Sequence, residues 1–232
     1  MNTQKLILFL SFCLTTMIAQ AQITDKISIR PTDVQLTKTQ EFNKIHWKSD
    51  YTISNEGEPE IPFHRVSYVL PIDAKVTGVT FQSAEKQLLR RDIYVYPSQP
   101  SLFVGYTEDV NFVQPNTKVY NSDAPYPGKL YEIESDDIIQ GYHVVTLRIY
   151  PFEYIPKSQL LNYYPDLEYI VEYESGTNTN VIQTETQSVL RADLCKKFIK
   201  QWVQNSSDIE KFGSSTRSLS NGRTIVQRSS SG

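Results

Sequence analysis

The sequence predicts a mainly β protein: an antiparallel β-sandwich or jelly-roll-like domain followed by a C-terminal amphipathic helix. Period-two patterns rich in Tyr, Val and Ile recur from about residue 27 to residue 174, and such alternation is typical of half-buried strands. All 12 prolines lie between Pro31 and Pro165, mostly where these runs begin or end, because proline cannot donate to a β ladder. No helical patterns alternate with the strand patterns, which argues against a doubly wound sheet.

The first 21 residues form a predicted signal peptide. Lys5 supplies the positive charge, residues 6–14 an apolar stretch, and Ala19-Gln20-Ala21 a small-x-small cleavage site. The apolar stretch is too short to span a bilayer as a transmembrane helix. A lipoprotein signal is excluded because Phe12, rather than a small residue, precedes Cys13.

Cleavage after Ala21 leaves 211 residues (232 − 21) and changes the formal net charge from −3 to −4, because Lys5 is lost. Cys195 is then the sole thiol, so the fold is held by burial and not by an intramolecular disulfide. We expect export through the inner membrane to the periplasm and then to the cell surface or the extracellular medium.

The β domain is expected to cover residues 22–174. Its clearest strand is at 167–174, where one face is apolar and three of the four alternating residues are Glu, as in a sheet with one wet face. The pattern at 142–150 also alternates, but both of its faces are largely apolar, which predicts a central strand. Further strands are predicted at residues 64–70, 76–81, 93–96 and 130–133.

The character of the chain changes after residue 174. Residues 175–187 are polar and proline-free and are expected to form a linker. An amphipathic helix is predicted at 188–204, because an apolar stripe recurs every four residues: Leu190, Leu194, Phe198 and Trp202. Residues 205–232 are expected to form a flexible tail, since the Ser-rich end of the chain offers little to bury.

Few residues in the chain are suited to catalysis or metal binding. Cys195 with a histidine is the only conceivable nucleophile–base pair, and its place beside the apolar stripe predicts a packed, inert thiol. The three histidines, His46, His64 and His143, lie far apart, and none has a partner at metal-ligand spacing. G-x-S-x-G and H-E-x-x-H motifs are absent. We therefore expect no catalytic residue, metal or cofactor in this chain.

Four acidic residues, Glu132, Glu134, Asp136 and Asp137, cluster around an expected turn. A calcium site or a carboxylate pair is conceivable there, but a solvated loop is favoured. The net charge of −3 and the pI of about 5.7 argue against a general nucleic-acid binder.

Several segments, in order along the chain, resemble the propeptide of the gingipain family of cysteine peptidases from Bacteroidetes-type bacteria. GEPEIP at residues 57–62 matches the G-x-P-x-(L/I)-P start of that propeptide. It is followed by DIYVYPS at 92–98, YPG at 126–128 and GY at 141–142. YPFEYIP at 150–156, with its P-x-x-Y-x-P pattern before a hydrophobic strand, is the most specific of the set.

The resemblance covers about residues 57–174, and the helix at 188–204 lies where such propeptides have one. It implies an N-terminal propeptide of a secreted cysteine-type endopeptidase, a zymogen segment that acts as an intramolecular chaperone and covers the active-site cleft of the peptidase domain. The implied partners are that catalytic domain, signal peptidase and the type IX secretion machinery. The catalytic His-Gly and Cys motifs belong to the peptidase domain. Here no His is followed by Gly and Leu194 precedes Cys195, so we expect the catalytic domain to be absent and the chain itself not to be an enzyme.

The loop at residues 98–115 is the first candidate for the segment that lies across the cleft. In arginine-specific members of the family a basic residue is expected to mimic the substrate, but this loop contains neither Lys nor Arg. It carries instead Leu102, Phe103, Val104 and Tyr106. Either the cognate peptidase has another primary specificity or another segment blocks the cleft, with Lys129 as the second candidate. A strand or a core-covering loop is an equal interpretation of the apolar run.

Two further predictions remain. Arg217, Arg223 and Arg228 are candidate processing sites, because cleavage in a tail requires little unfolding, although they are equally well explained as solubilising charges. The alternative function is a secreted surface adhesion or glycan-binding module, in which four tyrosines form a stacking platform: Tyr94, Tyr96, Tyr163 and Tyr164.

Overall fold

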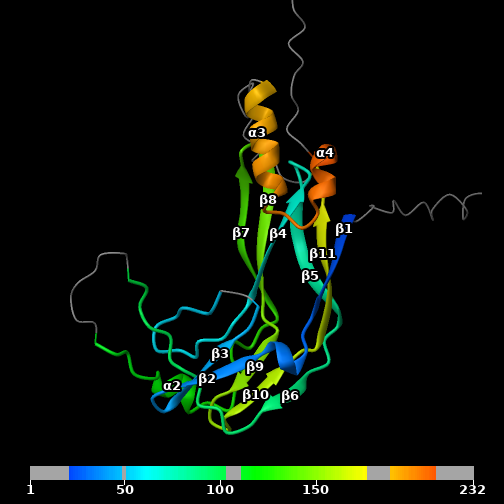
Figure 1. The fold of residues 1–232 in the computed structure, drawn as a ribbon. Helices are drawn as coiled ribbons and strands as arrows, with labels where there is room; N and C mark the ends of the chain where they lie inside the picture. Colours follow the sequence, from blue (N-terminus) through cyan, green and yellow to red (C-terminus); the bar gives the residue numbers. More distant parts are fainter. Residues whose placement is uncertain (1–20, 49–50, 103–110, 177–188, 213–232) are drawn as a thin grey trace, which may run out of the picture.

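The structure, a computed structural model, describes residues 21–48, 51–102, 111–176 and 189–212 (Figure 1). Within these residues the chain is mostly antiparallel β, which confirms the predicted fold class. The strands form four sheets, in the orders β1-β11-β5, β4-β8-β7, β6-β10-β9 and β2-β3. Their bounds are β1 Ala21–Ser28, β2 Gln35–Thr39, β3 Phe42–His46, β4 His64–Leu70, β5 Lys75–Ser83, β6 Gln87–Arg90, β7 Tyr131–Ile139, β8 Tyr142–Ile149, β9 Phe152–Ile155, β10 Leu160–Tyr163 and β11 Asp166–Glu174.

Two long sheets, β1-β11-β5 and β4-β8-β7, share the main hydrophobic core. Their contact includes a polar bridge, in which the Tyr169 hydroxyl lies 2.9 Å from the Tyr68 hydroxyl and Tyr68 donates to Asp25 at 2.6 Å. Both tyrosines are almost fully buried, so this bridge satisfies hydroxyls that would otherwise be unpaired in the core. Strands from three parts of the sequence are thereby held in one sandwich.

The two clearest sequence patterns are confirmed. In β11 the apolar residues alternate with exposed or half-buried ones, and the strand lies in the centre of its sheet. β8 is also central, between β4 and β7, and is apolar on both faces because each face is covered. Val145 and Leu147 enter the main core, whereas Tyr142 and Val144 enter a second one.

The second core is formed where helices cover the outer face of the β4-β8-β7 sheet. Val69 and Val144 pack there against Cys195, Ile199 and Ile209. The helices are α3 Val189–Lys200 and α4 Ile209–Phe212, with the 3₁₀ helix η2 Ser206–Asp208 between them. Among the described residues, no helix is long and apolar enough to cross a membrane.

The C-terminal predictions need two corrections. α3 ends at Lys200, before the predicted end at residue 204, because the chain there leaves the helix to pair with β4. The Asn205 side chain accepts from the Val69 N–H at 2.9 Å and donates to the Val69 carbonyl at 2.8 Å, as a neighbouring strand does. Residues 205–212, expected in the flexible tail, are ordered because Ile209 is buried, with 1% of its surface exposed.

The apolar stripe predicted for residues 188–204 faces outward and not into the core. Its central and last members are exposed, by 59% for Leu194, 40% for Phe198 and 52% for Trp202. The residues that pack inward are their neighbours Cys195, Ile199 and Val203. The structure does not describe whether the Leu190 side chain is buried.

Two strand-region predictions are corrected as well. Residues 93–96 form isolated bridges and no ladder, because single residues of two different segments flank them, Asn43 opposite Val95 and Pro59 opposite Pro97. The acidic cluster at residues 132–137 lies within strand β7 and not around a turn. The turn comes later, at Gln140 and Gly141, which both have positive φ.

The short sheets β6-β10-β9 and β2-β3 lie at the opposite end of the molecule from α3, together with α2 Thr117–Tyr120 (Figure 1). The 3₁₀ helix η1 Pro31–Asp33 connects β1 with β2. Trp47, which follows β3, packs edge-on against Phe152 of β9 with ring centroids 5.5 Å apart. This end of the fold is the one that supports the loop at residues 98–115.

The buried tyrosines are expected to make the folded protein less stable at alkaline pH. Burial raises the pKa of Tyr68, Tyr154 and Tyr169, in the case of Tyr154 to about 12. An unfolded tyrosine ionises near pH 10, so their stabilising contribution is complete below pH 10 and is lost as the pH rises towards the folded-state values. We expect the free energy of unfolding to fall above pH 10, by about 1.4 kcal/mol per pH unit for each tyrosine that ionises only on unfolding.

Urea titrations at pH 8, 10 and 11 test this expectation, with phenolate absorbance recorded during each titration. Phenolate formation by the buried tyrosines should coincide with loss of the folded state. An unchanged urea midpoint between pH 8 and pH 11 contradicts it.

Candidate functional site

The two ends of the loop at residues 98–115 meet at Gly57. The Gly57 N–H donates to the Ser98 carbonyl at 2.8 Å, and the Gly57 carbonyl accepts from the Asn116 N–H at 2.8 Å. Ser98 is held further by its own N–H, which donates to the Glu58 carbonyl, and by its hydroxyl, which donates to the Ile53 carbonyl. The backbone of one residue therefore closes the base of the loop.

Gly57 occupies a position that favours glycine. Its φ is +76°, in the left-handed region that residues with a Cβ seldom adopt. A Cβ at this position would lie 3.0 Å from the Gln114 carbonyl oxygen, closer than such contacts are normally found. The first residue of the GEPEIP motif thus closes the base of the loop in a backbone conformation that favours glycine.

The side chain of Gln99 forms a second closure across the loop. Its amide nitrogen donates to the Val113 carbonyl at 3.0 Å and to the Pro97 carbonyl at 2.9 Å, while its amide oxygen accepts from the Val113 N–H at 2.9 Å. A primary amide can donate and accept at the same time. Here it bonds to both the N–H and the carbonyl of Val113 on the returning side of the loop, as a backbone peptide group does in a β-sheet. Sequence reasoning missed Gln99, because nothing in its neighbourhood marks it as the partner of a residue 14 positions away.

Aromatic packing and a helix cap hold the returning end of the loop. The ring of Phe112 lies 5.8 Å from those of both Phe42 and Tyr96. Asn116 caps α2 through its side chain, which accepts from the Lys118 N–H. The buried hydroxyl of Tyr120 in α2 donates to the Val95 carbonyl at 2.8 Å. The loop therefore emerges from a base that is fixed on both sides.

The motif segments at 126–128 and 150–156 converge on the same base, whereas Tyr142 of the GY segment lies in the second core. Tyr154 is fully buried and its hydroxyl donates to the Ile93 carbonyl at 2.7 Å, which fixes the segment leading to Pro97. The backbones of Tyr154 and Tyr126 exchange two hydrogen bonds of 2.9 and 2.8 Å, and the Tyr126 hydroxyl donates to Glu58 at 3.0 Å. Segments separated by up to about 100 residues in the sequence thus form one support.

Of the predicted loop residues, the structure describes Leu102, which is 54% exposed. Phe103, Val104 and Tyr106 lie outside the described residues. Leu102 is therefore available on the surface, beyond the closure that Gln99 makes. The predicted role of these four side chains stays a prediction.

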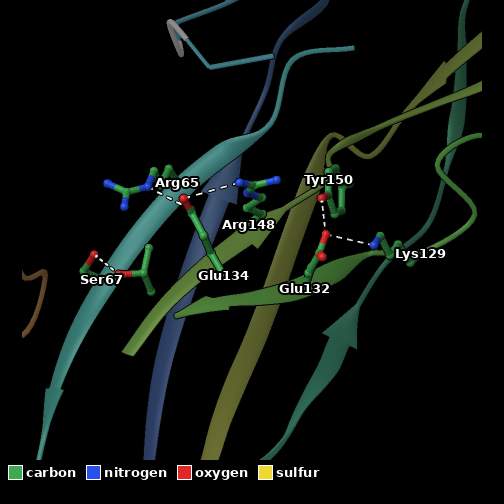
Figure 2. A network of polar contacts seen from close by, with 8 residues as sticks. Arg65, Ser67, Lys129, Glu132, Glu134, Arg148 and Tyr150 are labelled. Atoms are coloured by element: carbon green, nitrogen blue, oxygen red, sulfur yellow. Dashed lines mark hydrogen bonds and ion pairs between the residues drawn. The ribbon is translucent and has the colours of Figure 1, made fainter. Parts of the chain in front are cut away.

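Lys129, the second candidate, is engaged in contacts within the domain. Its ammonium donates to Glu132 at 2.8 Å, and the same carboxylate accepts from the Tyr150 hydroxyl at 2.8 Å (Figure 2). The hydrogen bonds from Lys129 and Tyr150 lower the pKa of Glu132. Lys129 follows a turn with a cis Tyr126-Pro127 bond and borders a pocket of about 210 Å³ that Phe152 and Tyr164 also line.

A second polar network lies beside this one on the β4-β8-β7 sheet (Figure 2). Glu134 on β7 accepts from Arg65 on β4 at 2.8 Å and pairs with Arg148 on β8 at 3.4 Å. Burial alone would raise the pKa of Glu134, but hydrogen bonds from the two arginines outweigh it and lower the pKa. Glu134 thus pairs with cations across the sheet, and Glu132 pairs with nearby Lys129. The described residues contain no group of three or more His, Cys, Asp or Glu placed to hold a metal ion.

Cys195 and the three histidines have structural partners. Cys195 is buried, with 8% of its surface exposed, and its thiol lies 3.3 Å from the side-chain oxygen of Gln140. His143 is buried between the Pro71 carbonyl and Asp136, and His46 lies 2.8 Å from the Thr37 hydroxyl. Burial lowers the pKa of His64, whose ring meets Trp47 edge-on. The described contacts of Cys195 match those of a packed thiol.

The predicted tyrosine platform does not exist as an exposed surface. Tyr163 and Tyr164 are buried, with 4% and 8% exposed, because both belong to the main hydrophobic core. Tyr94 stacks on Phe42 at 4.8 Å, and Tyr96 is covered by the Lys44 ammonium at 4.1 Å. The exposed tyrosine platform, on which the prediction of a glycan-binding module was based, is therefore not present.

Two sets of predicted sites fall at or beyond the limits of the described residues. Ala21, the predicted last residue of the signal peptide, is the first residue of β1 and lies opposite Tyr173. Residues 1–20 lie outside the description, and so do Arg217, Arg223 and Arg228.

Comparisons with known proteins cover most of the chain. The sequence matches one family model, Propeptide_C25, over residues 15–198. No curated protein matches it. The fold is similar to a solved complex of the pro- and mature domains of RgpB from Porphyromonas gingivalis, with a TM-score of 0.63, 16% identity, and coverage of 84% of this chain and 95% of that chain. It is also similar to a structure that describes the zymogenic latency of gingipain K from the same organism, with a TM-score of 0.59, 22% identity, and coverage of 67% and 88%.

Proposed function

The chain belongs to the Propeptide_C25 family, a family of cysteine peptidase propeptides, and from that premise we propose that it acts as both chaperone and inhibitor of a gingipain-type endopeptidase. Its inhibitory part is the loop at residues 98–115, which lies across the active-site cleft of the peptidase domain. The chain contributes no catalytic group to the reaction. It regulates proteolysis by occupying the place of the substrate.

The observation that carries this proposal is the double closure at the base of the loop. A peptide that enters a protease cleft loses conformational freedom, and this loss weakens its binding. In this chain, Gly57 and Gln99 fix the two ends of the loop before it meets the enzyme. A loop that is already ordered at its base binds with a smaller entropic cost, and it keeps its place in the cleft even if one of its peptide bonds is cut.

The chaperone part of the proposal is supported by the extent of the folded core. One hydrophobic cluster joins strands from both long sheets with the short sheets around the loop. Domains with a core of their own fold as units, and the N-terminal unit folds first during synthesis. A folded propeptide can then offer a surface on which the peptidase domain completes its folding.

For localisation we propose export by the signal peptide, with cleavage after Ala21, followed by release through the type IX secretion system. The sequence features of residues 1–21 support the first step. Cleavage there leaves all but the first residue of β1 in place, so the sandwich keeps its pairing with β11. Final removal of the propeptide is proposed at Arg217, Arg223 or Arg228, which follow the last described helix.

The proposal is tested by adding residues 22–232 to the mature C25-type peptidases of the source organism, each produced without its own propeptide. We expect inhibition with saturable, reversible kinetics. Gln99→Ala should raise the inhibition constant about tenfold, which corresponds to the loss of about 1.4 kcal/mol of binding free energy through loosening of the loop.

Gln35→Ala provides the matched control, because Gln35 is exposed on β2 and has no side-chain hydrogen bond among the described contacts. It should inhibit as the unchanged chain does. Full activity of every such peptidase at saturating propeptide contradicts the proposal. A positive glycan array under those conditions would instead support a binding module.

A further inference from the structure

A pocket of about 550 Å³ lies beside β1 and β4 and contains none of the residues that close the base of the loop. Residues 25–28 of β1, the chain that follows β3, and the start of β4 form its wall. Trp47 and Tyr51 give this wall two large aromatic rings. A pocket of this volume accommodates a small organic ligand or a short peptide. We refer to it as the β1–β4 pocket.

The indole N–H of Trp47, in the wall of this pocket, is a donor without an acceptor. Trp47 is buried, with 9% of its surface exposed, and its Nε1 has no hydrogen-bond partner among the described residues. Unpaired buried donors are rare in folded proteins, and each one points to an acceptor such as a water, an ion or a ligand. Because Trp47 lines the β1–β4 pocket, an acceptor that enters the pocket can supply this partner.

His64 adds an imidazole that the fold leaves without hydrogen bonds. Its ring meets that of Trp47 edge-on, and neither of its nitrogens has a hydrogen bond among the described contacts. Burial lowers the pKa of His64, so the ring is neutral at pH 7. A neutral imidazole offers one donor and one acceptor. A titratable group that burial has shifted, placed in the wall of a pocket, is typical of a binding site.

Lys48 supplies an unpaired positive charge to the same wall. Of the other two cations there, Lys26 pairs with Asp166 at 3.0 Å. Arg65 pairs with Glu134 at 2.8 Å. Lys48 is exposed and has no ion pair within the part of the chain that the structure describes. The charge available to a ligand is therefore that of Lys48.

These charges favour a ligand with a single carboxylate. One unpaired ammonium matches one negative charge, and the Asp25 carboxylate in the same wall would repel a second. A phosphate usually recruits an arginine, but Arg65 is already held by Glu134. The two aromatic rings of the wall favour a flat or apolar group beside the carboxylate.

We propose that the β1–β4 pocket binds a peptide carboxylate. The ammonium of Lys48 pairs with the carboxylate, and an apolar or aromatic side chain of the peptide lies against Trp47. The indole N–H of Trp47 and the ring of His64 supply hydrogen bonds. The carboxylate is either a free C-terminus, which hydrolysis of a peptide bond creates on one product, or the side chain of Asp or Glu. The inference does not depend on the proposed function, because the pocket and the base of the loop share no residue.

Nitrogen-15 NMR of residues 22–232 tests the contact directly, because the two tryptophans give two indole N–H signals. N-acetyl-alanyl-phenylalanine carries a free C-terminal carboxylate, and N-acetyl-phenylalanyl-glutamic acid α-amide carries a side-chain carboxylate. The Trp47 signal should shift in a saturable way, with a dissociation constant below about 1 mM for the preferred probe. The signal of Trp202, which does not line the pocket, should stay in place, and the Trp202→Phe variant assigns both signals.

Variants of Lys48 identify the charge that carries the binding. Lys48→Gln should raise the dissociation constant of the preferred probe about tenfold, whereas Lys48→Arg should keep the affinity. Lys38→Gln is the matched control, because Lys38 is an exposed lysine on β2 that has no ion pair among the described residues and does not line the pocket. The thermal midpoints of these variants should agree with that of the unchanged chain, since both lysines are exposed.

The outcomes decide between ligands as well as for or against the site. The preferred probe assigns the carboxylate to a C-terminus or to a side chain, and N-acetyl-alanyl-phenylalanine amide should bind at least about tenfold more weakly than its acid. Equal binding of the amide, or equal losses in Lys48→Gln and Lys38→Gln, overturns the inference. So does inorganic phosphate that shifts the Trp47 signal at lower concentration than either probe. If neither probe shifts that signal at concentrations up to about 10 mM, the inference is wrong and the proposed function stands.

Discussion

Replacing Tyr154 by alanine is expected to lower the free energy of unfolding by about 4 kcal/mol, as removal of a large aromatic side chain from a core commonly does. Tyr154 is fully buried, and its hydroxyl donates to the Ile93 carbonyl at 2.7 Å. The substitution leaves a cavity and an unpaired carbonyl in the segment that leads to the loop. Urea denaturation at pH 7 measures the change.

Two further variants separate the contributions of Tyr154. Tyr154→Phe keeps the ring and removes the hydrogen bond, so a smaller loss of about 1–3 kcal/mol is expected from the unsatisfied carbonyl of Ile93. Leu88→Ala, at an exposed position on β6, should change stability by no more than about 0.5 kcal/mol. Equal stability of Tyr154→Ala and Leu88→Ala would show that Tyr154 does not support the core as described.

The second large effect is expected at Gly57. Gly57→Ala should lower the free energy of unfolding by about 1–3 kcal/mol, because alanine is strained at φ +76° and its Cβ would lie 3.0 Å from the Gln114 carbonyl. Since Gly57 bonds to both ends of the loop, inhibition of a C25-type peptidase should weaken together with stability. Denaturation and inhibition assays on the same preparation measure both.

Gly78 offers a matched control for this substitution. It lies in β5, has no positive φ, and a Cβ built there meets no atom within 4 Å. Gly78→Ala should therefore leave inhibition unchanged and stability the same or slightly higher. Equal effects at the two positions are incompatible with a specific role for Gly57 at the base of the loop.

The strands could be predicted from the sequence where every second residue packs into the core. The alternation at residues 167–174 predicted a strand with one apolar face, and the double-sided apolar run at 142–150 predicted a central strand, because these patterns depend on local geometry alone. Residues 93–96 carry a strand-like composition as well. They form only isolated bridges, since their neighbours come from segments near Asn43 and Pro59 that no local pattern reveals.

The helix shows a different limit of sequence reasoning. A four-residue period marked Leu194, Phe198 and Trp202 as one apolar face, but Ile199 and Cys195 form another. Periodicity cannot decide which of two apolar faces turns inward, because the answer depends on the shape of the sheet beneath. The structure selects the face that fits between Val69 and Val144.

For the candidate site, the loop after Pro97 could be chosen from the proline and from the family resemblance, and its role in the cleft stays a prediction. The pairing of Gln99 with Val113 and the contact of Gly57 with both loop ends depend on how distant segments meet. They became visible only in the folded chain.

We propose that this chain covers the catalytic cysteine of a C25-type peptidase. The decisive measurement is the rate at which a small alkylating reagent labels that cysteine, with and without residues 22–232 at a concentration that binds the enzyme fully. We predict that labelling slows at least tenfold when the propeptide is bound, and that it recovers in part with Gln99→Ala at an equal total concentration. An unchanged labelling rate on an enzyme that is shown to be fully bound would contradict occlusion of the cleft.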